Sequence, residues 1–175
     1  MKRKIDSISE CTPDEIVEWL RVAREGPVDL LLRNACWLDV FRGVFHYGDV
    51  AVHDGRIMGT GRYPAIREID LGGAYLSPGL IEGHIHIESA MVSPVEFGLT
   101  VLARGTTTVV ADPHELANVC GIEGIRYMLN ANEHVPADIF IMLPSCVPAT
   151  DMETSGACLL ARDLLTLKDH PMVLG

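Results

Sequence analysis

The amino-acid sequence predicts an α/β fold built on a parallel sheet, and two observations carry this prediction. After Pro78, short apolar stretches rich in β-branched residues alternate with segments of helical periodicity. The polar and ionisable residues of this part follow the ends of the expected strands. Continuous apolar strands separated by helices are typical of parallel sheets, either closed into a barrel or doubly wound. Because no glycine-rich phosphate loop follows these strands, a nucleotide-binding doubly wound sheet is disfavoured.

The first expected element is a helix over residues 12–25. Thr12 is a candidate N-cap, Pro13 occupies the first helical position, and Glu15 is placed to complete a capping box. Gly26-Pro27 then interrupts the helical pattern. This segment is therefore expected to be structural.

Short strands and tight turns are expected from Val28 to about Leu76. Asp54-Gly55 is a strong signal for a two-residue hairpin turn, because both residues tolerate a positive φ. Strands are predicted at 29–33, 49–53 and 56–59. No cluster of chemically active side chains marks this part of the chain.

Successive strand–helix units are expected after Pro78. The stretch 106–111 is apolar and β-branched, and Gly105 ends the helical pattern before it. Strands are predicted at 80–86, 106–111, 138–143 and 172–174, and helices at 94–104, 121–132 and 158–168.

The composition limits the partners of the protein. Fourteen basic and 24 acidic residues give a net charge of −10, which disfavours binding to nucleic acid or to an anionic membrane. No apolar run approaches the roughly 18–20 residues that a membrane span needs. The five cysteines are scattered without a Cys-x-x-Cys pair, which favours reduced thiols in the cytoplasm.

Two histidines at a spacing of two mark the strongest candidate site. On a strand, His84 and His86 point to one face, while Ile85 and Ile87 point to the other. Two imidazoles on one face can bind one metal ion, although hydrogen bonds in a core could also satisfy them. Glu82 and Glu88 share the parity of the pair and are therefore expected on the same face. Four ionisable groups on one face are costly without a compensating charge, which a metal ion supplies.

Polar residues also follow the next two strands. Asp112-Pro113-His114-Glu115 comes after the strand at 106–111, and Ser145-Cys146 after the strand at 138–143. In a parallel β/α barrel, catalytic residues lie on the loops after the carboxyl ends of the strands. Each has a structural alternative: a turn cap for Asp112, a solvated loop for His114-Glu115, and a self-bonded turn for Ser145.

These motifs resemble a known family. The stretch from Ser77 to His86 is similar to the first barrel strand of the amidohydrolase superfamily, the metal-dependent β/α-barrel hydrolases. The stretches 86–89, 104–115 with Asn118-Val119, 145–149 and 169–171 are similar to bacterial adenine deaminases. The resemblance implies a partial (β/α)8 TIM-type barrel in residues 78–175, comprising its first three to four βα units. It also implies a small β-sandwich part at 28–77, after an N-terminal helical segment at 1–27.

The resemblance further implies hydrolytic deamination of adenine to hypoxanthine and ammonia. His84 and His86 would bind a divalent metal, with Mn²⁺ or Fe²⁺ expected and Zn²⁺ also compatible with imidazole and carboxylate ligands. Glu115 is expected to contact the substrate or transfer protons, and Asp112 and His114 to orient it. Two further residues are expected at the substrate, namely Ser145 and Glu88. For Glu88, a bond to the second nitrogen of one histidine is also expected.

The same resemblance predicts that the chain is an N-terminal fragment. Enzymes of the family have several hundred residues, and a glutamate that bridges two metals is expected just beyond Gly175. The expected partners are a small purine base and either a second copy of the chain or the rest of the barrel. Two alternatives stay open: another amidohydrolase that acts on cyclic amides, and a catalytically silent fragment that needs a partner chain.

Overall fold

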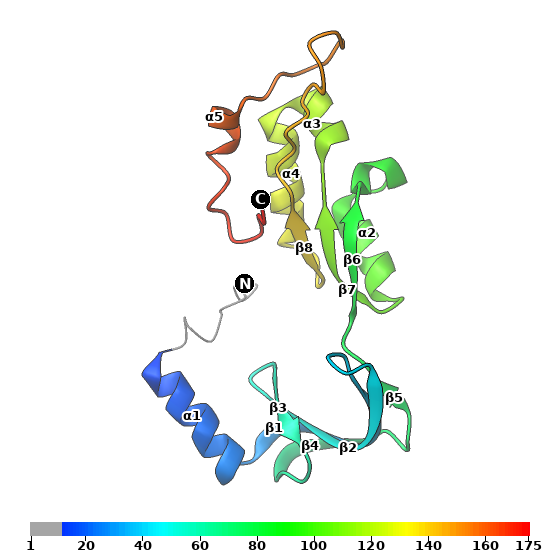
Figure 1. The fold of residues 1–175 in the computed structure, drawn as a ribbon, viewed down its shortest axis with the longest axis vertical. Helices are drawn as coiled ribbons and strands as arrows, with labels where there is room; N and C mark the ends of the chain where they lie inside the picture. The colour runs from blue at the N-terminus through cyan, green and yellow to red at the C-terminus, as the bar shows by residue number, and fades with distance from the viewer. Residues whose placement is uncertain (1–11) are drawn as a thin grey trace. The chain divides into compact units, whose positions relative to one another are not determined.

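The computed structural model describes residues 12–175, which form two compact units, 12–78 and 79–175 (Figure 1). The first unit combines one helix with a mixed sheet, and the second combines helices with a parallel sheet. The predicted α/β class is therefore confirmed for the second unit, which holds all the candidate site residues.

The first unit opens with helix α1 (Pro13–Arg24), as predicted. The capping box is present: the N–H of Glu15 donates to Thr12 Oγ1 at 3.3 Å, and the N–H of Thr12 donates to Glu15 Oε2 at 2.8 Å. These two bonds satisfy helix donors that have no partner within the helix.

The sheet of the first unit has the strand order β3-β2-β1-β4, with β5 pairing with β1. Its strands are β1 (Val28–Asp39), β2 (Val44–His53), β3 (Arg56–Thr60), β4 (Ala65–Asp70) and β5 (Tyr75–Leu76). Asp54 and Gly55 have φ values of 50° and 72°, which confirms the predicted hairpin turn between β2 and β3.

Strand β1 is longer than predicted and extends well past Arg33. A shift of register between Leu32 and Ala35 accommodates Asn34, which has a φ of 53°. Such a bulge lets a strand continue through a polar interruption. The sequence did not predict β4 and β5.

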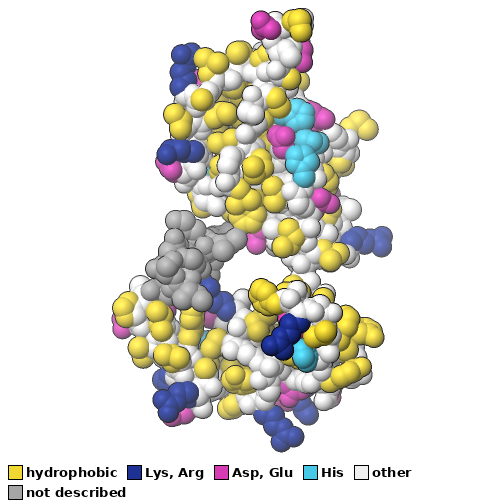
Figure 2. Space-filling view, viewed as in Figure 1, with side chains coloured by type: hydrophobic (Ala, Val, Ile, Leu, Met, Phe, Trp, Pro, Cys, Tyr) yellow, Lys and Arg dark blue, Asp and Glu magenta, His cyan; other side chains and the backbone are white. Residues whose placement is uncertain are grey.

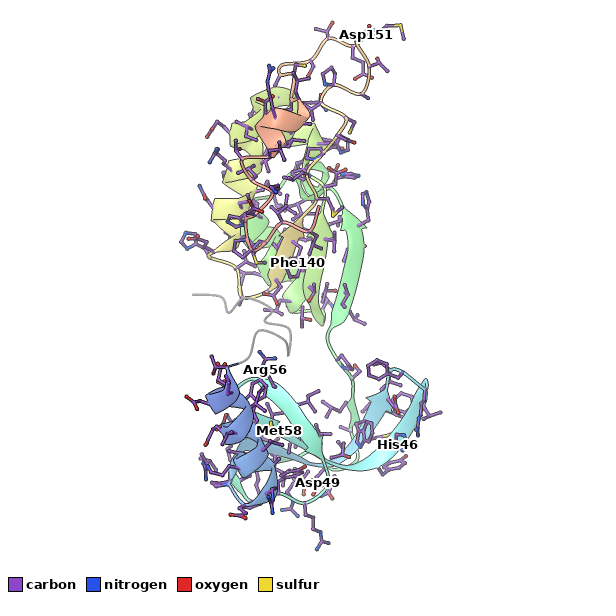
Figure 3. The ribbon with its side chains drawn as sticks, turned by 60° about the vertical axis from the view of Figure 1, so that its left-hand side comes forward. His46, Asp49, Arg56, Met58, Phe140 and Asp151 are labelled. Carbon is purple, nitrogen blue, oxygen red and sulfur yellow. The ribbon has the colours of Figure 1, made fainter. Side chains whose placement is uncertain are left out.

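Helix α1 packs on this sheet through Val22, which is buried together with Val28, Leu31 and Ala51. At the same contact the Arg56 guanidinium lies 4.8 Å from the ring centre of Trp19. Figure 3 shows Arg56 and Met58 beside the helix. An amphipathic helix over one sheet face gives this unit its own small core.

The second unit contains a three-stranded parallel sheet of order β6-β7-β8. Its elements are β6 (Leu80–Ile85), η2 (Ile87–Ala90), α2 (Pro94–Leu102), β7 (Thr106–Ala111), α3 (His114–Cys120), α4 (Ile122–Asn132), β8 (Asp138–Ile141) and α5 (Ala161–Leu164). Because the strands are parallel, their carboxyl ends and the segments that follow them lie at one edge of the sheet.

The core of the second unit lies between the sheet and helices α2 and α4. Val109 and Ala111 of β7 and Ile139 of β8 are buried there, against Ile125 and Met128 of α4. Alternate residues of β7 are less buried, as expected where the two faces of a strand differ.

Two predicted elements of this unit differ from the structure. The helix expected at 158–168 is reduced to the single turn α5, because the N–H of Leu159 donates to the carbonyl of Val147 at 2.8 Å and holds the chain extended before it. The strand expected at 172–174 consists of one parallel bridge between Val173 and Ile141. Among residues 12–175, no helix is long and apolar enough to cross a membrane.

Asp70 gives the first unit a pH-dependent contact. A hydrogen bond from Asn34 Nδ2 at 2.9 Å and another from the N–H of Gly72 at 2.9 Å hold the pKa of this exposed carboxyl below its usual range. The contribution to stability is therefore present above the ordinary aspartate pKa, and it is lost as the pH falls through the lowered value.

We expect Asp70→Asn to lower the urea midpoint of unfolding at about pH 7 and to have a much smaller effect at about pH 3. Asp151→Asn serves as the control, since Asp151 is exposed in a loop (Figure 3). A difference between wild type and Asp70→Asn that does not change with pH would contradict this account.

Candidate metal and catalytic site

His84 and His86 come together at the carboxyl end of β6. Their Nε2 atoms are 3.3 Å apart, and their ring centres are 4.9 Å apart at an interplanar angle of 85°. Ile85 packs against the core and Ile87 is 1% exposed, so the apolar residues of the motif face the opposite side. The predicted common direction of the two imidazoles is therefore confirmed.

The tautomer of His86 follows from its backbone partner. His86 Nδ1 lies 2.8 Å from the carbonyl oxygen of Asp112. Because a carbonyl oxygen only accepts, Nδ1 carries the proton that is donated. In the neutral ring, Nε2 then keeps its lone pair and directs it towards His84. A hydrogen bond from the other ring nitrogen to a carbonyl is the usual support of a metal-binding histidine.

Asp112 completes a group of three potential metal ligands. Each of His84, His86 and Asp112 offers one ligand atom, and these three atoms lie within 4.8 Å of one another. Asp112 is anchored by its backbone, since its N–H donates to the carbonyl of Ile85 at 2.9 Å. Its Oδ1 is buried and has no hydrogen-bond partner among the described residues.

This group fits a divalent cation. Two nitrogens bound at about 2.0–2.1 Å to one tetrahedral ion are about 3.3–3.4 Å apart, and the two Nε2 atoms are separated by 3.3 Å. A cation beside Asp112 would also satisfy a buried carboxylate oxygen that otherwise carries a desolvation cost. Imidazole nitrogens with a carboxylate oxygen suit zinc and other first-row divalent metals.

Helix α3 brings the next two predicted residues to the same place. His114 is its first residue, and the His114 ring lies edge-on to His86 with ring centres 4.6 Å apart. Its Nδ1 is 3.4 Å from Asp112 Oδ2, without the geometry of a hydrogen bond. Glu115 is exposed and follows His114 in the first turn. Figure 2 shows histidine side chains gathered beside acidic side chains on this unit.

Glu88 lies elsewhere than the strand pattern predicts. Strand β6 ends at Ile85 and residues 87–90 form the 3₁₀ turn η2, so the alternation of faces stops before Glu88. Its Oε1 accepts a hydrogen bond from the N–H of Leu116 at 3.2 Å. The expected bond between Glu88 and a histidine nitrogen is therefore wrong: Oε2 of Glu88 has no hydrogen-bond partner among the described residues, and His86 Nδ1 bonds the carbonyl of Asp112 instead.

Ser145 is exposed in the segment that follows β8. Within residues 12–175, no hydrogen bond joins Ser145 to His84, His86, His114 or Asp112. A contact with substrate from Ser145 stays a prediction, as do the substrate role of Glu88 and the catalytic roles of Asp112, His114 and Glu115.

Ser89 and the carbonyl of Asp112 were not identified from the sequence as parts of the site. Ser89 Oγ lies 2.9 Å and 2.8 Å from the two carboxylate oxygens of Glu115. The sequence did offer one signal for Ser89, namely a hydroxyl side chain only three residues after a predicted metal ligand, His86. A backbone carbonyl carries no sequence signal, because every residue has one.

Comparison with known families decides the classification. Residues 75–170 match the amidohydrolase family. The chain belongs to this family. The match begins just before β6 and includes both histidines, Asp112 and all of α3.

Several relatives of this amidohydrolase are adenine deaminases. The chain is 55% identical over 149 residues to adenine deaminase 2 of Carboxydothermus hydrogenoformans, with 85% of this chain and 26% of that protein covered. It is 51% identical over 163 residues to the adenine deaminase of Kosmotoga olearia, with 91% and 28% covered. The chain thus spans about a quarter of the length of these relatives.

Solved structures support the fold alone. An L-hydantoinase (dihydropyrimidinase) from Arthrobacter aurescens superimposes with a TM-score of 0.51 at 18% identity, over 66% of this chain and 27% of that one. An N-acyl-D-glutamate deacylase from Bordetella bronchiseptica gives a TM-score of 0.50 at 16% identity, over 82% and 35%.

Removal of either histidine should weaken metal binding. We expect His84→Ala and His86→Ala each to lower the affinity for a divalent metal by at least about 10-fold, because each removes one nitrogen ligand. Metal content per chain after dialysis, measured by mass spectrometry, checks this. His134→Ala is the matched control, since His134 is exposed at the end of α4. Equal metal content in all variants would show that the two histidines are not ligands.

Proposed function

We propose that this amidohydrolase catalyses the hydrolytic deamination of adenine to hypoxanthine and ammonia. The observation that carries the proposal is an identity of 51–55% to adenine deaminases, over a stretch that includes all the candidate site residues. The convergence of His84, His86 and Asp112 supports it, because the chemistry needs an activated water.

The reaction exchanges an amine for an oxygen at C6 of the purine ring. A bond forms between C6 and the oxygen of water, and the bond between C6 and the exocyclic nitrogen breaks. When bound, a divalent metal lowers the pKa of its water to about 7 and so supplies a hydroxide nucleophile. The ring nitrogen next to C6 gains negative charge during attack, and the leaving nitrogen must receive a proton to depart as ammonia.

We infer that Glu115 moves those protons. Its carboxylate is exposed on the first turn of α3, next to His114 and three residues after Asp112. A carboxyl group can donate a proton to the ring nitrogen and later pass one to the departing amine. Asp112 and His114 would orient the site around it, and Glu88 and Ser145 would line the substrate.

The identity of the metal and the setting of the reaction belong to the same proposal. We infer Mn²⁺ or Fe²⁺ as the metal, with Zn²⁺ as an alternative compatible with the ligand types. Deamination of adenine would place the protein in purine metabolism. Scattered cysteines without a paired motif favour the reducing cytoplasm, and a net charge of −10 disfavours anionic partners.

We further infer that β6, β7 and β8 open a (β/α)8 barrel, in which additional strands complete both the sheet and the metal site. Leu80 and Ile81 of β6 are 62% and 70% exposed, as expected for a strand that awaits a neighbour. Those strands would come from further sequence or from another copy. The mixed sheet of residues 28–77 would form part of a small β-sandwich.

Two alternatives are separated by simple assays. An amidohydrolase that acts on cyclic amides would hydrolyse hydantoin or dihydropyrimidine rings rather than adenine; the likeness to the hydantoinase supports only the fold. A catalytically silent fragment would bind its partner strands without turnover. For the 175-residue chain alone we expect little or no turnover, because three strands do not close a barrel around the site.

The proposed function is tested with Glu115→Gln in the product of the complete reading frame. Glutamine keeps the shape of the side chain but transfers no proton, so we expect kcat for adenine to fall by about 10²–10⁴-fold with unchanged metal content. Hypoxanthine formation is followed by absorbance and ammonia by a coupled assay. Glu133→Gln, at the exposed end of α4, is the matched control. Absence of hypoxanthine formation by the wild-type protein would refute the proposal.

Metal removal provides a second test. Dialysis against a chelator should abolish adenine turnover, and added Mn²⁺ or Fe²⁺ should restore it more fully than Zn²⁺, if the ligand set has the proposed preference. The measurement is initial rate against added metal, with metal content determined in parallel. Full activity after complete metal removal would contradict a metal-activated water.

A further inference from the structure

The side chains of Ser89 and Glu115 join two elements of the site that are 26 residues apart in the sequence. Ser89 Oγ lies 2.9 Å from Glu115 Oε1 and 2.8 Å from Oε2. A hydroxyl has one proton to donate and lone pairs to accept with. It can therefore donate to a carboxylate, and it can equally accept from a protonated carboxylic acid, so the contact is available in both protonation states of Glu115.

Ser89 belongs to a turn that is fixed relative to the histidines. In η2 the N–H of Ser89 donates to the carbonyl of His86 at 3.2 Å, and Ile87 beside it is buried in the core. His86 is in turn bonded to the carbonyl of Asp112. The hydroxyl of Ser89 is thus held at a defined place beside the candidate metal ligands.

Glu88 already connects the same turn to α3. The residue before the helix is Pro113, which supplies no side-chain cap. The N–H of Leu116 instead finds its acceptor in Glu88 Oε1 at 3.2 Å. This bond holds the backbone of the first turn of α3, so attachment of η2 to the helix does not depend on Ser89 alone. The hydrogen bond between Ser89 and Glu115 therefore adds a defined position for the Glu115 side chain.

We propose that Ser89 is a positioning residue for Glu115. The inference rests on the proposed function, in which Glu115 moves protons on the substrate. Glu115 has three rotatable side-chain bonds and is exposed, so without a partner its carboxylate would occupy several rotamers. Ser89 restricts the carboxylate to one place during the cycle, first as donor to the carboxylate and then as acceptor from the acid. Misplacement of a catalytic group by about 1 Å can cost about 10²-fold in rate.

The test uses the metal-loaded product of the complete reading frame and adenine as substrate. We expect Ser89→Ala to lower kcat by about 10-fold, with KM changed by less than about 3-fold and metal content unchanged. Ser89→Thr keeps the hydroxyl and should recover kcat to within about 3-fold of wild type. In a Glu115→Gln background, Ser89→Ala should cause no further loss, since a residue that acts through Glu115 has nothing left to position.

The controls separate positioning from loss of stability. Ser93→Ala removes the N-cap of α2, where Ser93 Oγ accepts from the N–H of Glu96 at 3.2 Å, and it should destabilise the unit without changing kcat. Wild-type kcat in metal-loaded Ser89→Ala, or a full 10-fold loss that persists beside Glu115→Gln, would overturn the proposal.

Failure of the proposed function would give a different result. A wild-type protein that leaves adenine unchanged but hydrolyses a cyclic amide refutes the deaminase. The same variants are then assayed on the accepted ring, where dependence of the Ser89 effect on Glu115 supports the positioning role and independence overturns it.

Discussion

The hydrogen bond from His86 Nδ1 to the carbonyl of Asp112 is the contact on which the rest of the site depends. The N–H of Asp112 donates to the carbonyl of Ile85, so residues 85 and 86 hold both backbone groups of Asp112. The pairing of β6 with β7 is irregular between Glu82 and Ile85, and it resumes at Ile85, opposite Ala111, next to the site. The bond from His86 to the carbonyl of Asp112 fixes the proton of His86 on Nδ1 and leaves Nε2 as an acceptor. Together the two backbone bonds place the Asp112 side chain within reach of both imidazoles.

The same parallel pairing explains why η2 and α3 meet. Each follows its strand by only one or two residues, at the same edge of the sheet. Pro113 has no side-chain acceptor with which to cap α3. The N–H of Leu116 therefore donates to the carboxylate of Glu88 in the neighbouring turn η2. A negatively charged acceptor at a helix amino end is favourable both as a hydrogen bond and towards the helix dipole. The first turn of α3, which carries His114 and Glu115, is thereby attached to the turn that follows the histidines.

Local patterns predicted the parts of this arrangement that depend only on the chain nearby. The direction of His84 and His86 follows from the period of a strand, and the strand at 106–111 from its β-branched composition. Glu88 was misplaced because the same period was continued beyond Ile85, where the chain turns into η2. Helix α3 was missed because it is short and its cap comes from a residue 28 positions away. Such a contact exists only after β6 and β7 have paired.

A cation accounts for the polar groups of the site better than mutual hydrogen bonding does. A bond between the two Nε2 atoms could satisfy the imidazoles, but it would leave Asp112 Oδ1 buried without a partner among the described residues. Each such group costs about 1–3 kcal/mol when it is desolvated and unpaired. Three ligand atoms within 4.8 Å of one another concentrate that cost at one point. A protein whose free energy of unfolding is only about 5–15 kcal/mol can carry this desolvation cost where a bound ligand offsets it. A divalent metal offsets it for nitrogen and oxygen donors alike.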